Sequence, residues 1–269
     1  MDAVVTIDIG NSRLSWGRFE GDRLRSRGHL TREECRAKGA LAALRTRWGR
    51  VSSVGIASVE SDLATRVADE WPEDLPAPRW FRGFADLPLS LAPAMRHPET
   101  IGIDRLLNVF AWVESRRALP ALIVDVGTAI TIDVADAEGR FAGGVILPGE
   151  RLLARALVGG TAFLPEVVAE VSSGGSAIGT ETRSAIARGI GGLVVGGVSH
   201  HLRRMARELT GRALSTGGGS GSRSRRAPVV VATGGGAARW APAIEEIERV
   251  VPALTLDGIR LALVRGAGG

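Results

Sequence analysis

The chain has 269 residues, of which 45% are hydrophobic, so it can form a substantial core as one large domain or two domains of ordinary size. Its net charge of +5 comes almost wholly from arginines spread along the chain, which argues against nucleic-acid binding. The single cysteine, Cys35, excludes an intrachain disulfide and a cysteine-based zinc cluster, and it fits a reducing cytoplasm.

The apolar segments predict no membrane span. The amino terminus, "MDAVVTIDIG", lacks a basic n-region, and its apolar run is too short for a signal peptide. No apolar stretch approaches the length of a transmembrane helix. We therefore expect a cytoplasmic protein.

The first half of the chain predicts alternating strands and helices. In chain order we expect a strand at 3–10, a hairpin at 12–30, a helix at 31–48, a strand at 51–59, and helices at 61–71 and 102–118. Thr31 as N-cap and Glu34 form a capping box, and Ser61 is the expected N-cap of the next helix. The six prolines from Pro72 to Pro98 predict irregular structure.

The second half repeats this plan. We expect a strand at 121–129, a hairpin and a further strand at 130–149, helices at 150–161, 181–197 and 198–209, and a strand at 228–236. The order strand, turn, strands, helix thus occurs twice, from Ala3 and from Ala121, which indicates an internal repeat. The low-complexity segment 215–227, "STGGGSGSRSRRA", predicts a flexible surface insertion.

Each half begins with a strand that runs into an Asp-x-Gly turn, "DIGNSRLSWG" at 8–17 and "DVGTAITID" at 125–133. Such a strand places its carboxylate at the sheet edge where α/β proteins bind ligands. The glycine lets a phosphate approach the backbone amides, and the small polar residues after it can donate hydrogen bonds. Because a carboxylate repels phosphate, it needs a cation between them. Two such turns predict a nucleotide held from both sides.

A single Asp-x-Gly after a strand is also common in plain turns, so one copy would be weak evidence. Two copies that head the same supersecondary unit are much harder to explain by chance. A third glycine turn, "VVVATGGGAARW" at 229–240, follows another buried strand, and in a two-lobed kinase it would lie near the base or ribose.

These motifs carry a resemblance. The chain resembles the acetate kinase, sugar kinase and actin superfamily and, within it, the type III pantothenate kinases. The motifs of that family occur in its order from Asp8 to Arg260: "DIGNS", "GIDR", "DVGTAITID", "GGVILPG", "ETRSAIARG", "TGGG" and "LTLDGIR". The resemblance implies an α/β fold of two ribonuclease-H-like domains, an actin-like ATPase duplication that we expect at 1–117 and 118–269, with a nucleotide cleft between them. It also implies phosphorylation of pantothenate by ATP with Mg²⁺, the first step of coenzyme A biosynthesis.

The same resemblance assigns roles to individual residues. The expected ATP-binding residues are Asp8, Ile9, Gly10, Asn11, Ser12, Arg13, Leu14, Ser15 and Thr128. The expected pantothenate-binding residues are Gly102, Ile103, Asp104, Arg105 and Thr182. Asp104 is the general base, Arg105 suits the pantothenate carboxylate, and Asp125 holds a monovalent cation, K⁺ or NH₄⁺. The family is dimeric, and the resemblance allows Thr182 to contact substrate from the partner subunit of a homodimer.

The chain departs from the family pattern at several positions. Ser12 replaces a common threonine but keeps the hydroxyl. Glu181 replaces an asparagine and adds negative charge near an anionic substrate. Met95 and His97 stand where many members have a tyrosine that lines the substrate pocket, and His97 fits either a substrate contact or a turn. The motif "GIDR", taken alone, also fits an N-capping aspartate followed by a helix-surface arginine.

Two other functions fit the sequence. One is a kinase of the same superfamily for a sugar, a carboxylate or another small hydroxylated substrate; "GIDR" ahead of the second turn favours pantothenate instead. The other is a catalytically weak relative that acts as a regulatory or accessory protein. The intact Asp8, Asp104, Asp125 and Thr128 argue against an inactive site.

Overall fold

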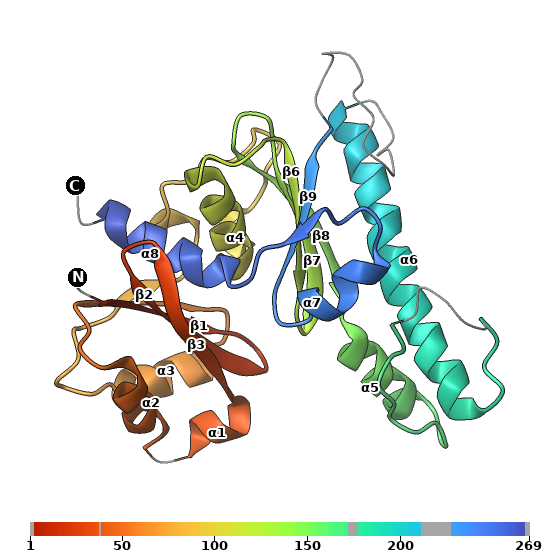
Figure 1. The fold of residues 1–269 in the computed structure, drawn as a ribbon, viewed down its shortest axis with the longest axis horizontal. Coiled ribbons are helices and arrows are strands. Elements are labelled where there is room, and N and C mark those ends of the chain that lie inside the picture. Colours follow the sequence, from red (N-terminus) through yellow and green to blue (C-terminus); the bar gives the residue numbers. More distant parts are fainter. Residues whose placement is uncertain (1–2, 38, 172–176, 211–226, 267–269) are drawn as a thin grey trace. The chain divides into compact units, whose positions relative to one another are not determined.

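The computed structural model describes residues 3–37, 39–171, 177–210 and 227–266, so most of the segment expected as a surface insertion at 215–227 lies outside the described residues. The chain divides into two compact units (Figure 1). Unit 1 comprises Met1–Ser90, Met95–Arg117 and Ala253–Gly269, and unit 2 comprises Leu91–Ala94 and Ala118–Pro252.

Unit 1 is built on a five-stranded mixed sheet in the order β3-β2-β1-β4-β5. Its strands are β1 (Ala3–Ile9), β2 (Arg13–Glu20), β3 (Arg23–Thr31), β4 (Ser53–Ser58) and β5 (Arg79–Phe81). β2 pairs antiparallel with β1 and with β3, whereas β4 pairs parallel with β1 and with β5. The expected hairpin at 12–30 is confirmed, and it turns at Gly21, whose φ of 63° favours glycine.

Unit 2 contains a second five-stranded sheet with the equivalent order, β8-β7-β6-β9-β10. Its strands are β6 (Ala121–Val126), β7 (Ala129–Ala135), β8 (Phe141–Pro148), β9 (Val229–Thr233) and β10 (Arg249–Val250). The parallel and antiparallel pairings match those of unit 1 strand for strand. The internal repeat is therefore confirmed, and in both sheets the central strand is the one that runs into an Asp-x-Gly turn.

Helices cover both faces of the sheet in unit 1. They are α1 (Arg32–Arg36), α2 (Ala40–Trp48), α3 (Ser61–Asp69), α4 (Ile103–Glu114) and α8 (Leu254–Gly266), with 3-10 turns η1 (Phe84–Asp86) and η2 (Pro98–Thr100). α1, α2 and α3 bury apolar side chains against one face. On the other face α8 lies over Gly55 and against α4: a Cβ on Gly258 would lie 2.5 Å from the Leu107 carbonyl oxygen. This contact explains the glycine in "LTLDGIR".

In unit 2 the helices α5 (Glu150–Gly160), α6 (Thr182–Thr210) and α7 (Ala237–Trp240), with the 3-10 turn η3 (Ala241–Ala243), pack on one face of the sheet (Figure 1). The buried stripe of α6 is spaced four residues apart and consists of Ile186, Ile190, Val194, Val198, Leu202 and Ala206. Among the described residues no helix is both long and apolar enough to cross a membrane.

The units depart from the expected domains at two places. We expected the second domain to run over 118–269, but α8 packs in unit 1. Conversely, Leu91–Ala94 belongs to unit 2 because Leu91 forms a β-bridge with Phe141 and the Ala92 N–H donates to the Phe141 carbonyl at 2.9 Å. Composition alone cannot show that a chain leaves one domain and later returns to it.

Several local predictions need correction. The helix expected at 31–48 is two helices, because Gly39 adopts a left-handed conformation with φ of 80° between them. The capping box of Thr31 and Glu34 is confirmed. The cap of α3 is Glu60 and not Ser61, since the Glu60 carboxylate accepts the Leu63 N–H at 2.6 Å.

Two longer elements also differ from expectation. The proline-rich stretch 72–98 is not wholly irregular, because it contains β5, which completes the sheet by pairing with β4. The helices expected at 181–197 and 198–209 form one helix of 29 residues. Packing of its buried stripe outweighs the low helix propensity of its glycines.

Candidate functional site

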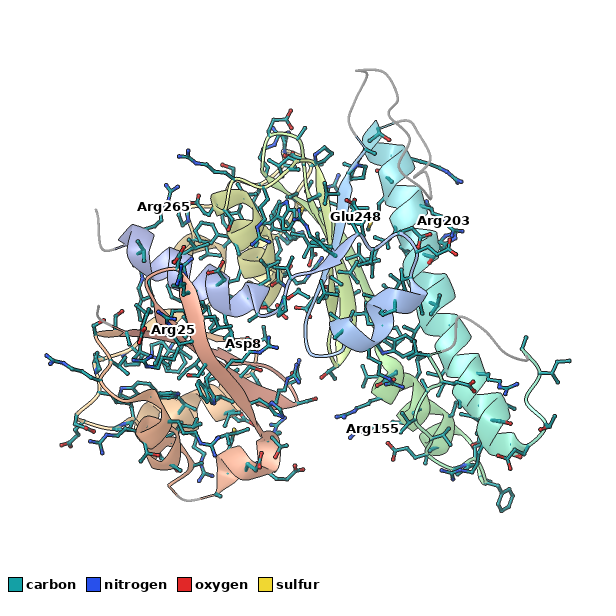
Figure 2. The ribbon with its side chains drawn as sticks, viewed as in Figure 1. Asp8, Arg25, Arg155, Arg203, Glu248 and Arg265 are labelled. Carbon is teal, nitrogen blue, oxygen red and sulfur yellow. The ribbon has the colours of Figure 1, made fainter. Side chains whose placement is uncertain are left out.

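The first turn closes at the end of β1 in unit 1. The Gly10 N–H donates to the Arg13 carbonyl at 3.0 Å, and Asn11 and Ser12 are exposed at the tip. Asp8, labelled in Figure 2, is partly buried and lies on the sheet face that α8 covers. The turn therefore presents a carboxylate and two small polar side chains at one sheet edge.

The flanking residues of this turn have structural roles. Ile9 and Leu14 are fully buried in the core of unit 1, so only their backbone is available to a ligand. Ser15 is partly buried in β2, directly opposite Asp8 in the antiparallel pair. Of the expected ATP-binding stretch, the side chains of Asp8, Asn11 and Ser12 are thus the better placed for ligand contact.

The "GIDR" motif forms the first turn of α4. Its N-cap is Gly102, so the alternative in which the aspartate caps the helix is wrong. Asp104 Oδ1 accepts the Arg105 N–H at 2.9 Å, and a Cβ on Gly102 would lie only 2.6 Å from the same oxygen. Ile103 is buried beneath them. A side chain at position 102 would therefore force the Asp104 carboxylate to shift.

Burial raises the pKa of the Asp104 carboxyl above its ordinary value, and the N–H and positive charge of Arg105 oppose this only in part. A carboxylate with a raised pKa is a better proton acceptor than an ordinary one. The neighbourhood of Asp104 is therefore suited to general-base chemistry.

The second turn closes at the end of β6 in unit 2. The Gly127 N–H donates to the Ala129 carbonyl at 3.0 Å, and Gly127 itself is exposed. Asp125 is partly buried and lies between Thr131 on β7 and Thr233 on β9. This carboxylate thus has a hydroxylated neighbour on each side.

The "GGVILPG" motif brings the start of α5 to this turn. Gly149 is the N-cap of α5, and its N–H donates to the Thr128 carbonyl at 3.1 Å. A Cβ on Gly149 would lie 2.5 Å from that oxygen. Because the amino-terminal end of a helix favours anions, α5 adds to the anion-binding character of the turn.

The "TGGG" motif packs on the same turn from β9. The Gly236 N–H donates to the Val126 carbonyl at 2.8 Å. Gly234 has a φ of 88°, and a Cβ there would lie 2.2 Å from Asp125 Oδ1 and 2.7 Å from the Val126 carbonyl oxygen. Unit 2 therefore gathers the glycines at 149 and 234–236 around the turn that follows Asp125.

Other expected site residues are not brought to these turns. Thr182 is exposed at the start of α6, and its side chain makes no hydrogen bond within the described part of the chain. The neighbouring Glu181 is exposed as well. His97 is an exposed turn residue ahead of Pro98, with φ of 55°, which favours its interpretation as a turn.

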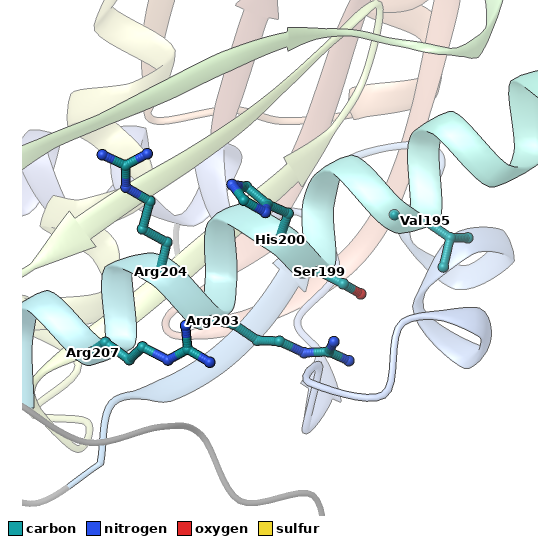
Figure 3. A pocket seen from close by; sticks show the side chains of 7 residues that line it. Val195, Ser199, His200, Arg203, Arg204 and Arg207 are labelled. Atoms are coloured by element: carbon teal, nitrogen blue, oxygen red, sulfur yellow. The ribbon is translucent and has the colours of Figure 1, made fainter.

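A separate hollow of about 540 Å³ follows α6 (Figure 3). It is lined by Val195, Gly196, Ser199, His200, Arg203, Arg204 and Arg207. None of the expected site residues lines it. The described residues include no group of three or more His, Cys, Asp or Glu side chains that could hold a metal ion.

Comparison with known proteins decides the family. A family model described as type III pantothenate kinase matches residues 4–204. The chain belongs to the type III pantothenate kinase family. A type III pantothenate kinase of Rubrobacter xylanophilus is 34% identical over 268 residues, covering 96% of each chain, and one of Dehalococcoides mccartyi is 31% identical over 96% of this chain and 94% of its own. The predicted family is confirmed.

Solved structures support the fold. Component A of (R)-2-hydroxyglutaryl-CoA dehydratase from Acidaminococcus fermentans aligns over 100% of both chains, with a TM-score of 0.50 and 12% identity. The ethanolamine utilization protein EutJ from Carboxydothermus hydrogenoformans aligns over 97% of this chain and 90% of its own, with a TM-score of 0.52 and 14% identity. The expected α/β fold with two ribonuclease-H-like sheets is confirmed for this pantothenate kinase family member.

We predict that Gly234→Ala lowers stability because its Cβ would collide with Asp125 Oδ1. Overpacking of this kind costs about 1–3 kcal/mol beyond the backbone strain. Gly21→Ala is the control, since Gly21 also has a positive φ but nothing lies within 4 Å of its Cβ position. Thermal unfolding followed by circular dichroism compares the two variants. Equal losses would contradict the close contact at Gly234.

Proposed function

We propose that this protein phosphorylates pantothenate with ATP to give 4'-phosphopantothenate, the first step of coenzyme A biosynthesis, and does so in the cytoplasm. The observation that carries the proposal is the equivalent pair of Asp-x-Gly turns, one at the end of each central strand, in a chain of the type III pantothenate kinase family. ATP would bring Mg²⁺ with it, because phosphoryl transfer needs the metal to neutralise charge on the phosphates.

Asp104 is the proposed general base. The primary hydroxyl oxygen of pantothenate attacks the γ-phosphorus of ATP, the bond to the bridging oxygen breaks, and ADP leaves. The hydroxyl proton passes to Asp104, whose raised pKa supports this role. Arg105, the next residue of α4, would bind the pantothenate carboxylate with its two-pronged guanidinium group.

The two turns are the proposed phosphate sites. In unit 1 this is the stretch from Asp8 to Ser15, through its exposed tip and its backbone amides. In unit 2 it is Thr128, beside the start of α5. Thr182 is a proposed pantothenate contact, supplied by either subunit of a dimer, and its exposure is compatible with that role.

Asp125 is the proposed ligand of a monovalent cation, K⁺ or NH₄⁺. Its Oδ1 and the Val126 carbonyl oxygen both lie within 2.7 Å of the Cβ position that Gly234 leaves empty. A carboxylate oxygen and a carbonyl oxygen are donors that hard cations prefer, so these residues fit such an ion. The cation would offset the repulsion between Asp125 and the ATP phosphates.

Release of ADP, coupled to NADH oxidation, tests the function. We expect ATP consumption to depend on pantothenate and to be absent with sugars or other small carboxylates. A kinase for another hydroxylated substrate would give the opposite preference, and a regulatory relative without activity would consume no ATP under any condition.

Asp104 and Asp125 should fail in different ways when each is changed to asparagine. Asp104→Asn cannot take a proton, so kcat should fall by about 10²–10⁴-fold. Its KM for pantothenate should change little, because the amide oxygen still accepts a hydrogen bond. In the wild type, kcat/KM should fall as the pH drops through the raised pKa of Asp104, so the acid limb should lie above the ordinary aspartate range.

Asp125→Asn should instead raise the KM for ATP and weaken cation binding, so added K⁺ should restore part of the rate. Steady-state kinetics across a K⁺ titration, with pantothenate affinity measured separately, distinguish the two variants. Near-normal turnover of Asp104→Asn would remove it as the base. Unchanged activity of the wild type in a bulky organic cation would remove the monovalent site.

A homodimer is the proposed assembly. Of the ten exposed large hydrophobic side chains in the described part of the chain, seven lie in unit 2, namely Ile146, Leu152, Val158, Phe163, Val168, Ile178 and Leu193. Phe163 is 94% exposed, and Leu193 on α6 is 64% exposed. Exposed apolar patches often mark interaction sites, and the open Gly189, Gly192 and Gly196 would let another helix approach α6 closely.

We predict a mass of two chains by light scattering at micromolar concentration. Leu193→Glu should shift the mass toward one chain, because the charge would be buried in the interface. Arg27→Glu, an exposed charge reversal on β3 of unit 1 and away from the apolar side chains of unit 2, is the control. A stable monomer of the wild type would refute the dimer.

A further inference from the structure

Arg239 joins three segments of unit 2. It lies in α7, three residues after Gly236 of the third glycine turn. Its Nη1 is 2.6 Å and 2.5 Å from the two carboxylate oxygens of Glu150, and its Nη2 donates to the Ala169 carbonyl at 2.5 Å. The guanidinium also lies 5.3 Å from the ring centroid of the buried Trp240. A planar fork with several donors can make these contacts at once, whereas a lysine cannot.

Both partners of Arg239 are next to residues whose backbone hydrogen-bonds to segments with proposed roles. Glu150 is the first residue of α5 and follows Gly149, whose N–H binds the Thr128 carbonyl at 3.1 Å. Ala169 precedes Glu170, whose N–H donates to the Ala187 carbonyl in α6 at 3.0 Å. Arg239 therefore ties the third glycine turn to the backbone that holds Thr128 and to the segment bound to α6.

The solvent exposure of this ion pair argues against a purely stabilising role. The side chains of Arg239 and Glu150 are 39% and 23% exposed. Ion pairs with such access to solvent contribute little to stability. Its geometric role is more direct, because one side chain links the helix after the third glycine turn to a helix start that hydrogen-bonds to the second turn.

We infer that Arg239 is a positioning residue for the nucleotide. Acting through Glu150 and Gly149, it holds the Thr128 turn in the geometry that receives ATP phosphates. This inference rests on the proposed function of that turn. Arg239 is not a catalytic residue, since it acts on the turn through other residues.

The test compares Arg239→Ala, Glu150→Ala and the double variant. Displacing a phosphate-binding group by a fraction of an ångström to 1 Å can cost up to about 10²-fold, so we expect the KM and Kd for ATP to rise by about 10–100-fold. The KM for pantothenate and the midpoint of thermal unfolding should change little. Because both residues act through one contact, the double variant should be no worse than Arg239→Ala.

Arg203→Ala is the matched control. Arg203 forms an ion pair with the buried Glu246 in the same unit, with 2.5 Å between Nε and Oε1, and it contacts none of the glycine turns. Loss of this pair leaves a buried charge, so Arg203→Ala should lower stability more than Arg239→Ala does, without raising the KM for ATP.

Three results would overturn the inference: an unchanged Kd for ATP in Arg239→Ala, a parallel rise of KM for both substrates that follows the loss of stability, or the same rise in Arg203→Ala. Titration calorimetry of ATP in the absence of pantothenate separates this inference from the proposed function. A wild type that binds ATP but does not turn over pantothenate would refute the function, while the Kd values of the variants would still decide the role of Arg239.

Discussion

Close approach of backbone to backbone at the carboxyl end of β6 is the constraint on which the site in unit 2 depends. No Cβ fits at Gly149 or Gly234 without meeting the oxygens of residues 125–128. Only because side chains are missing there can segments from three parts of the chain exchange hydrogen bonds at 2.8–3.1 Å. Local propensity cannot supply this arrangement, since Gly234 requires a positive φ and Gly149 caps a helix without a side chain.

The two halves share a topology but not an identical turn. Ile9 pairs with Leu14, which leaves four residues in the first turn, whereas Val126 pairs with Ile130, which leaves three in the second. Beside Asp8 the neighbouring strands place a serine and an alanine, and beside Asp125 they place two threonines. The second turn is thus tighter and richer in oxygen atoms. This difference supports the proposal that a monovalent cation binds at the second carboxylate and not at the first.

Elements that depend on local sequence could be predicted, and those that depend on distant packing could not. The capping box of Thr31 and Glu34 involves residues three apart, and it forms as expected. The helix boundary expected between Gly197 and Val198 is absent, because α6 runs unbroken from Thr182 to Thr210. Within it a Cβ on Gly191 would meet the Glu170 carbonyl oxygen at 2.0 Å, so that glycine serves packing and not a turn. β5 could not be recognised in the proline-rich stretch, because its strand conformation depends on pairing with β4. The return of α8 to unit 1 likewise follows from packing on α4.

The candidate site shows the same contrast between features that local sequence predicts and features that depend on distant packing. Motifs and resemblance pointed to the turns and to Asp104, but "GIDR" by itself favoured a capping aspartate. The burial of Asp104 and the glycine cap distinguish the two, and neither can be read from four letters. The Arg239–Glu150 pair is the extreme case, because its members lie 89 residues apart and neither belongs to a turn. Side chains that hold a site together cannot be recognised from local sequence, because the fold, and not the adjacent residues, determines which groups they contact.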